Sequence, residues 1–74
     1  MQREMTEEIE FAVACVNEFA QKHGMANADA LRFLDSHKGL DYVLNGYVVV
    51  RNQPLELTLE DIRDVCRRNG GVFA

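Results

Sequence analysis

Apolar side chains recur every three or four residues along most of the chain, which is the spacing of one face of a helix. This pattern predicts four helices, over about residues 7–23, 28–38, 40–50 and 59–68. Short loops that contain Gly, Asn or Pro separate them. Four amphipathic helices of this length predict a small all-α bundle that forms one domain over residues 1–74.

The first predicted helix has clear signals at both ends. Thr6 is a good N-cap, and Gly24 stands where a C′ glycine belongs. Its core face is expected to contain Ile9, Ala12, Val13, Val16, Phe19 and Ala20, with Cys15 at the margin. Phe11 falls on the opposite, polar side of this helix.

The ends of the second and fourth helices are also marked. Asn27 is the expected N-cap of the second helix, and Gly39 is its expected C′ residue. Thr58 is the expected N-cap of the fourth, where Leu57 would pack on Ile62 as a hydrophobic staple. The fourth helix is expected to end at the sequence Asn69-Gly70-Gly71, and residues 72–74 would either fray or fold back on the core.

The third segment supports two interpretations. A helical stripe favours one helix over residues 40–50, formed by Leu40, Val43, Leu44, Tyr47 and Val48. The β-branched run Val48-Val49-Val50 favours a strand instead. The alternative is therefore a short β-hairpin near 47–58, turned at Asn52-Gln53-Pro54.

Composition and charge exclude several classes of protein. The 74 residues carry a net charge of −4, and no part of the chain is basic enough for a general nucleic-acid binder. The second and third helices resemble a helix-turn-helix with the hairpin as a wing, but the third begins Leu40-Asp41-Tyr42-Val43, with an acid and no Arg, Lys or Gln to read bases. A winged-helix-like DNA-binding protein is therefore kept only as the weaker alternative. The longest apolar run, residues 11–16, is too short to span a membrane, and no signal peptide is evident. We therefore expect a cytoplasmic protein without membrane contact, whose two cysteines are reduced and buried.

The usual arrangements of catalytic and metal-binding residues are missing from the sequence. Ser36 and His37 are adjacent, so their side chains point in different directions on a helix. Cys15 and His23 lie eight residues apart, which is too far for one metal ion. No zinc-binding or phosphate-binding spacing occurs either. We expect no catalytic residue, no metal site and no cofactor.

The remaining signal is apolar side chains that lie off the predicted core faces. Phe11, Tyr42 and Val49 are of this kind, and such residues indicate a contact patch. We expect a non-enzymatic protein-binding module whose contact residues are Phe11, Asp41, Tyr42, Tyr47 and Val49. Two alternatives stay open, in which the patch joins copies of this chain in a homo-oligomer, or small helices simply bury wide arcs.

Three stretches carry a resemblance to a known family. They are residues 9–18 (IEFAVACVNE), residues 40–47 (LDYVLNGY) and Glu60-Asp61-Ile62. The chain resembles a family of small uncharacterised bacterial proteins that is catalogued as a domain of unknown function. The resemblance implies an antitoxin-like or accessory partner of a neighbouring protein with an ADP-ribosyltransferase fold. The chain departs from the family at Val50-Arg51-Asn52-Gln53-Pro54, where members have a segment similar to L-H-T-Q-G.

Overall fold

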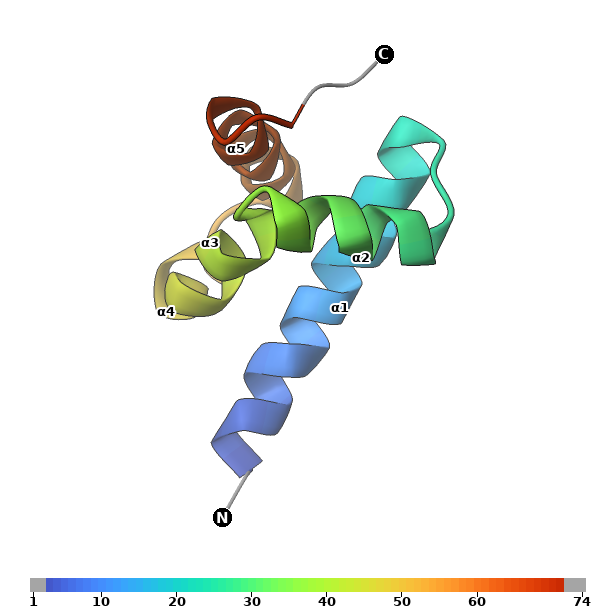
Figure 1. The fold of residues 1–74 in the computed structure, drawn as a ribbon. Helices are drawn as coiled ribbons and strands as arrows, with labels where there is room; N and C mark the ends of the chain where they lie inside the picture. The colour runs from blue at the N-terminus through green and yellow to red at the C-terminus, as the bar shows by residue number, and fades with distance from the viewer. Residues whose placement is uncertain (1–2, 72–74) are drawn as a thin grey trace.

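A computed structural model describes the backbone of residues 3–71 and the side chains of residues 7–71. Its helices are α1 (Arg3–His23), α2 (Asn27–Ser36), α3 (Gly39–Asn45), α4 (Tyr47–Val50) and α5 (Leu55–Arg68). The long α1 runs through the molecule, α2 and α3 cross it, and α5 packs on α3 (Figure 1). The all-α prediction is confirmed. The hairpin near 47–58 was wrong, because residues 47–50 and 55–68 are helical.

The core lies where α1, α2, α3 and α5 meet. Its buried side chains are Ala12, Cys15, Val16, Phe19, Ala20, Ala30, Leu34, Val43, Leu59, Ile62 and Cys66. Phe19 is fully buried and stacks on Phe33 with a centroid distance of 6.2 Å. Burial of a side chain of this size stabilises the fold by about 1.5–3 kcal/mol. Helix α1 supplies five of these residues and is therefore the central element of the bundle.

The buried face of α1 is rotated from the predicted one. Ile9 and Val13 are each 51% exposed, whereas Cys15 is buried and Phe11 is half-buried. The N-terminal turns of α1 extend beyond the other helices (Figure 1), and Ile9 is not part of the buried core. The helix also begins at Arg3, which places Thr6 inside it and not at its N-cap.

In the turn between α2 and α3, Gly39 is not the left-handed C′ residue that the sequence predicted. The left-handed residue is Lys38, with φ of 73°, and Gly39 is already the first residue of α3. A Cβ atom on Gly39 would lie 2.7 Å from Cys66 Sγ and 3.0 Å from Leu34 Cδ2. Gly39 is therefore needed for close packing, and Lys38 adopts the strained backbone in its place. The second helix likewise starts at Asn27, with Ala26 in the N-cap position.

The third predicted helix is broken into two pieces at Gly46. Helix α3 ends at Asn45, and α4 is a single turn that starts at Tyr47. The Gly46 N–H donates to the Tyr42 carbonyl at 3.0 Å, and the Gly46 carbonyl accepts from Val50 N–H at 2.8 Å. Tyr42 and Val49 therefore do not share one helix face, as a continuous helix would require.

Helix α5 begins earlier than predicted. Pro54 occupies the N-cap position with φ of −57°, and Leu55 is the first helical residue. Thr58 lies inside the helix and is buried, whereas Leu57 is 44% exposed and makes no staple on Ile62. The Thr58 hydroxyl donates to the Val50 carbonyl at 3.5 Å, which ties α5 to the end of α4. The predicted C-terminal end is confirmed: α5 stops at Arg68, and Gly70 has a positive φ of 89°. Residues 72–74 lie outside the described range.

Candidate partner-binding surface

Two of the predicted contact residues meet between α1 and α4. The rings of Phe11 and Tyr47 pack edge to face, with centroids 5.5 Å apart and planes inclined at 71°. The Arg51 guanidinium lies over the Tyr47 ring at 5.2 Å, a cation–π contact. Both aromatic residues are half-buried. This pair holds the short α4 against α1.

Tyr42 lies elsewhere, on the contact between α3 and α5. Its hydroxyl donates to Asp61 Oδ2 at 3.0 Å. Gln53 Nε2 lies 3.1 Å from Thr58 Oγ1 and 3.5 Å from Asp61 Oδ2. Burial raises the pKa of the Tyr42 hydroxyl, and the hydrogen bond to Asp61 raises it further. Tyr42, Gln53, Thr58 and Asp61 form a hydrogen-bonded cluster that joins α3, α5 and the loop before α5.

The remaining two predicted contact residues are exposed but belong to different helices. Val49 is 66% exposed on α4, and Asp41 is exposed on α3. Val49 has a neighbour of the same kind, because Val48 is 65% exposed. Of the run Val48-Val49-Val50, Val50 alone is buried. Its burial leaves two adjacent valines facing solvent.

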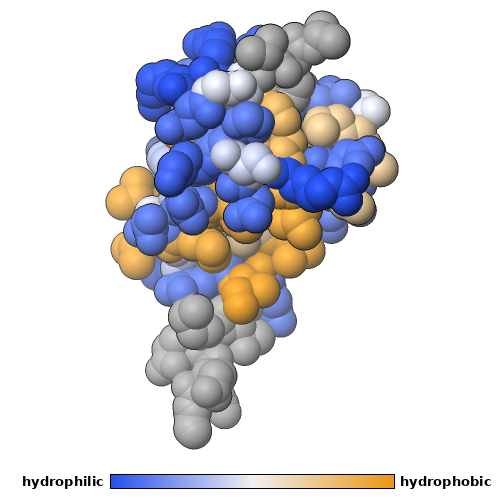
Figure 2. Space-filling view, in the orientation of Figure 1, coloured by the Kyte–Doolittle hydropathy of each residue, from blue (hydrophilic) through white to orange (hydrophobic). Residues whose placement is uncertain are grey.

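Exposed apolar side chains concentrate around the connection between α4 and α5. Seven large apolar side chains of the described part are well exposed: Ile9, Val13, Leu31, Val48, Val49, Leu55 and Leu57. Four of them fall within residues 48–57, and we call this group (Val48, Val49, Leu55 and Leu57) the α4–α5 corner. Figure 2 shows a belt of hydrophobic residues that runs from α4 toward the N-terminal half of α1.

The sequence pattern missed three members of the α4–α5 corner. Val48 was assigned to the buried stripe of one long helix, which Gly46 interrupts. Leu55 and Leu57 were placed before the fourth helix, although α5 includes both. Pro54 was the available signal, because proline is favoured at the start of a helix.

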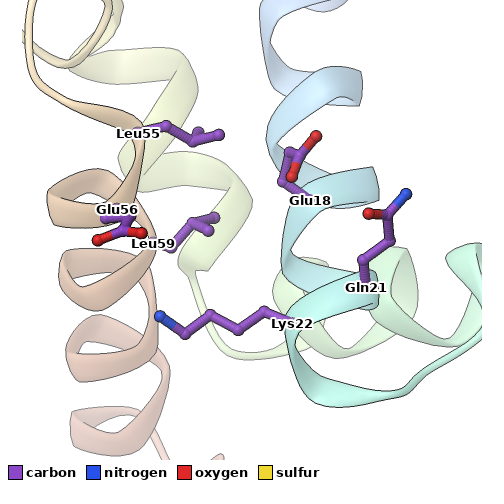
Figure 3. A pocket seen from close by; sticks show the side chains of 6 residues that line it. All are labelled: Glu18, Gln21, Lys22, Leu55, Glu56 and Leu59. Atoms are coloured by element: carbon purple, nitrogen blue, oxygen red, sulfur yellow. The ribbon is translucent and has the colours of Figure 1, made fainter.

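A groove runs between α1 and α5 beside this corner. It has a volume of about 370 Å³ and is lined by Glu18, Gln21, Lys22, Leu55, Glu56 and Leu59. In Figure 3, Leu55 and Leu59 project from α5 toward α1, while Glu18 and Lys22 line the opposite wall. Lys22 and Leu59 also line a second hollow of about 220 Å³, together with His23, Glu60, Arg63 and Asp64. The two hollows therefore adjoin each other at Lys22 and Leu59.

Three further titratable side chains, His23, Cys15 and Cys66, have shifted pKa values. The pKa of His23 is lowered by burial and by the positive charges of Arg63 and Lys22, so this side chain is neutral at pH 7. Burial raises the pKa of the Cys15 thiol to about 11, and that of Cys66 is raised as well. Both cysteines are free and buried. Neither thiol is an activated nucleophile, because each stays protonated at neutral pH.

Ser36 and His37 are adjacent at the C-terminal end of α2 and have different surroundings. Ser36 is exposed on α2, whereas His37 Nδ1 lies 3.1 Å from the Asn69 carbonyl oxygen. Among residues 7–71, no three His, Cys, Asp or Glu side chains are close enough to share a metal ion. The helices in the described range all fall short of the length and apolar character that crossing a bilayer requires.

A comparison with known protein families assigns the chain to one of them. Residues 10–69 match the model of DUF3791, described as a protein of unknown function. The chain belongs to this family. The resemblance seen in the sequence is thus confirmed for the domain itself, over most of its length. No curated protein and no solved structure matches it.

Proposed function

We propose that this DUF3791 protein is a non-enzymatic module that binds another protein through the α4–α5 corner. The observation that carries the proposal is the placement of four well-exposed valine and leucine side chains within residues 48–57. Single exposed apolar residues are common, but a local concentration is typical of a contact surface.

The local structure supports a rigid surface at this corner. The Phe11–Tyr47 pair fixes α4 on α1, and the Thr58 hydroxyl fixes the start of α5 to Val50. Asn52 Nδ2 also donates to the Val48 carbonyl at 3.0 Å, which orders the intervening turn. A pre-ordered apolar surface loses little conformational entropy on binding, so more of its burial contributes to affinity.

The proposal assigns roles to four of the five residues predicted from the sequence, and Asp41 receives none. Val49 would contact the partner directly. Phe11 and Tyr47 would support α4 from behind, with their exposed edges at the margin of the interface. Tyr42 and Asp41 lie on α3, and Tyr42 is engaged with Asp61. We expect Tyr42 to act mainly on the stability of the fold.

The antitoxin-like or accessory role that the family resemblance implied is one specific form of this function. In that form the partner is a co-encoded protein in the bacterial cytoplasm, and the corner covers part of its surface. Self-association is the second candidate, since the same exposed valines and leucines suit a copy of this chain.

The test compares two variants of a tagged protein in an extract of the native cell. Val48→Ser with Val49→Ser removes the centre of the corner, and Leu31→Ser on α2 is the matched control because Leu31 is 46% exposed. We expect the wild type and Leu31→Ser to retain a stoichiometric second protein that the double variant loses. Sedimentation of the purified chain reports self-association.

Two results would contradict the proposal. One is a captured protein that the double valine variant retains at full stoichiometry. The other is recovery of this chain alone, with a sedimentation coefficient of a monomer at all concentrations. A concentration-dependent dimer that the double variant abolishes would replace the hetero-complex with the homo-oligomer.

A further inference from the structure

We propose that the groove between α1 and α5 receives a basic amphipathic segment of the partner. An apolar side chain of that segment would pack on Leu55 and Leu59, and a Lys or Arg beside it would reach Glu18 and Glu56. This inference rests on the proposed function, because it names the chemistry of the segment that such a partner presents.

The floor of the groove is apolar and fixed. Leu55 and Leu59 are one helical turn apart on α5, and both point toward α1 (Figure 3). Leu59 belongs to the core and is only 5% exposed, while Leu55 is 42% exposed at the open end. The groove thus contains one leucine held in the core, Leu59, and one that is largely uncovered, Leu55. A side chain entering here would bury Leu55 without any change in the fold.

Carboxylates dominate the walls of the groove. Glu18 on α1 and Glu56 on α5 stand on opposite walls of the Leu55 end. The charged side chains that line the groove are two carboxylates, Glu18 and Glu56, and one cation, Lys22. The lining therefore has an excess of one negative charge.

Charge complementarity selects the occupant. A segment with an excess of Lys and Arg gains attraction from this lining, whereas an acidic segment is repelled. A second copy of this chain is a poorer fit, since the chain carries a net charge of −4. The open form of the groove suits a helix or an extended peptide laid along α5, a recognition mode in which leucine-like anchors occupy an apolar groove.

The first experiment uses defined peptides and the purified full-length chain. The probe is a synthetic amphipathic peptide of leucine and lysine with leucine at helical spacing, and its counterpart has glutamate in place of every lysine. Binding is followed by the amide signals of the ¹⁵N-labelled protein. We expect the lysine peptide to saturate and to shift the signals of Glu18, Lys22, Leu55 and Leu59. The glutamate peptide should leave them unchanged.

Matched variants separate the groove from the rest of the surface. Leu55→Ser should weaken binding of the lysine peptide about tenfold. Leu31→Ser on α2 is the control, since Leu31 has a similar exposure but does not line the groove. The double change Glu18→Gln and Glu56→Gln should weaken binding about five- to tenfold and reduce its salt dependence. Glu10→Gln, an exposed acid of α1 outside the groove, should have no effect.

Several outcomes would overturn the inference. They are equal binding of the two peptides, shifts that map away from the groove, or no saturable binding of the lysine peptide. Capture of the native partner distinguishes this failure from failure of the proposed function. If the Val48→Ser, Val49→Ser variant loses the partner while Glu18→Gln with Glu56→Gln retains it at full affinity, the binding function stands and the groove is not its site.

Discussion

The two sides of α5 differ sharply in how they meet their neighbours. On the α3 side, the helices touch so closely that a Cβ on Gly39 would lie 2.7 Å from Cys66 Sγ. Tyr42 and Asp61 add a hydrogen bond of 3.0 Å across the same contact. On the α1 side, a groove of about 370 Å³ separates Leu55 and Glu56 from Glu18 and Lys22. One helix thus has a closed face and an open face.

Under the proposed function, this difference separates a face of α5 that stabilises the fold from a face that binds the partner. A close-packed contact resists both enlargement and truncation of its side chains, because neighbours cannot relax without cost. An open contact tolerates substitution but leaves apolar surface uncovered, which a partner can bury. Changes on the closed face should therefore reduce the free energy of unfolding, and changes on the open face should reduce binding.

The largest effect is expected at the closest approach. Gly39→Ala places a methyl group against Cys66, Leu34 and Ile62, and should lower the free energy of unfolding by about 2–3 kcal/mol. Urea denaturation measures this loss. Gly24→Ala is the matched control, because it meets nothing within 4 Å and bears only the strain of its positive φ, about 1 kcal/mol. Equal losses in the two variants would mean that the α3–α5 contact is not tightly packed.

A smaller effect is expected from the hydroxyl of Tyr42. Tyr42→Phe keeps the ring but removes the hydrogen bond to Asp61, at a cost of about 1 kcal/mol near neutral pH. The pKa of Tyr42 is raised in the folded state, so this stabilisation is complete below the unfolded pKa of about 10 and is lost as the pH rises through the folded value. Unfolding curves of Tyr42→Phe should lack this alkaline component. A variant as stable as the wild type would show that the hydroxyl contributes nothing.

The open side should show only a modest dependence on pH. The pKa of His23 is lowered by burial and by Arg63 and Lys22, so the folded state disfavours the proton. The stabilisation is present above the unfolded pKa of about 6.5 and is lost as the pH falls through the folded value. Replacement by His23→Gln should flatten the melting temperature between about pH 7 and pH 5 relative to the wild type. If the melting temperature of the variant instead falls more steeply with decreasing pH than that of the wild type, the expected effect of His23 is contradicted.

Helical periodicity was enough to predict the fold class and the approximate positions of the helices. It could not predict the break at Gly46, because Tyr47 and Val48 continue the apolar stripe of Leu40 and Val43. Thr58 was misassigned for a related reason. Its preference for the N-cap is local, whereas its buried hydrogen bond to Val50 depends on how α4 and α5 pack.

The proposed binding surface was less predictable than the fold. Val49 was predicted as a contact residue because it lies off the predicted stripe, and it is one of the most exposed apolar residues described. Leu55 was not predicted, because the N-cap was assigned to Thr58 and Leu55 was therefore placed before the helix. In the structure α5 already begins at Leu55. The groove depends on the spacing of two helices that are distant in sequence, and no local pattern encodes that spacing.

The contrast between the two faces is tested most directly by measuring stability and partner retention on the same two variants. Tyr42→Phe changes the closed face and Leu55→Ser the open face. We predict that Tyr42→Phe loses about 1 kcal/mol of unfolding free energy and keeps the partner. We predict that Leu55→Ser changes stability by less than about 0.5 kcal/mol and loses the partner. If Leu55→Ser instead unfolds the protein, or if Tyr42→Phe releases the partner with its stability intact, the assignment of stability to one face of α5 and binding to the other is contradicted.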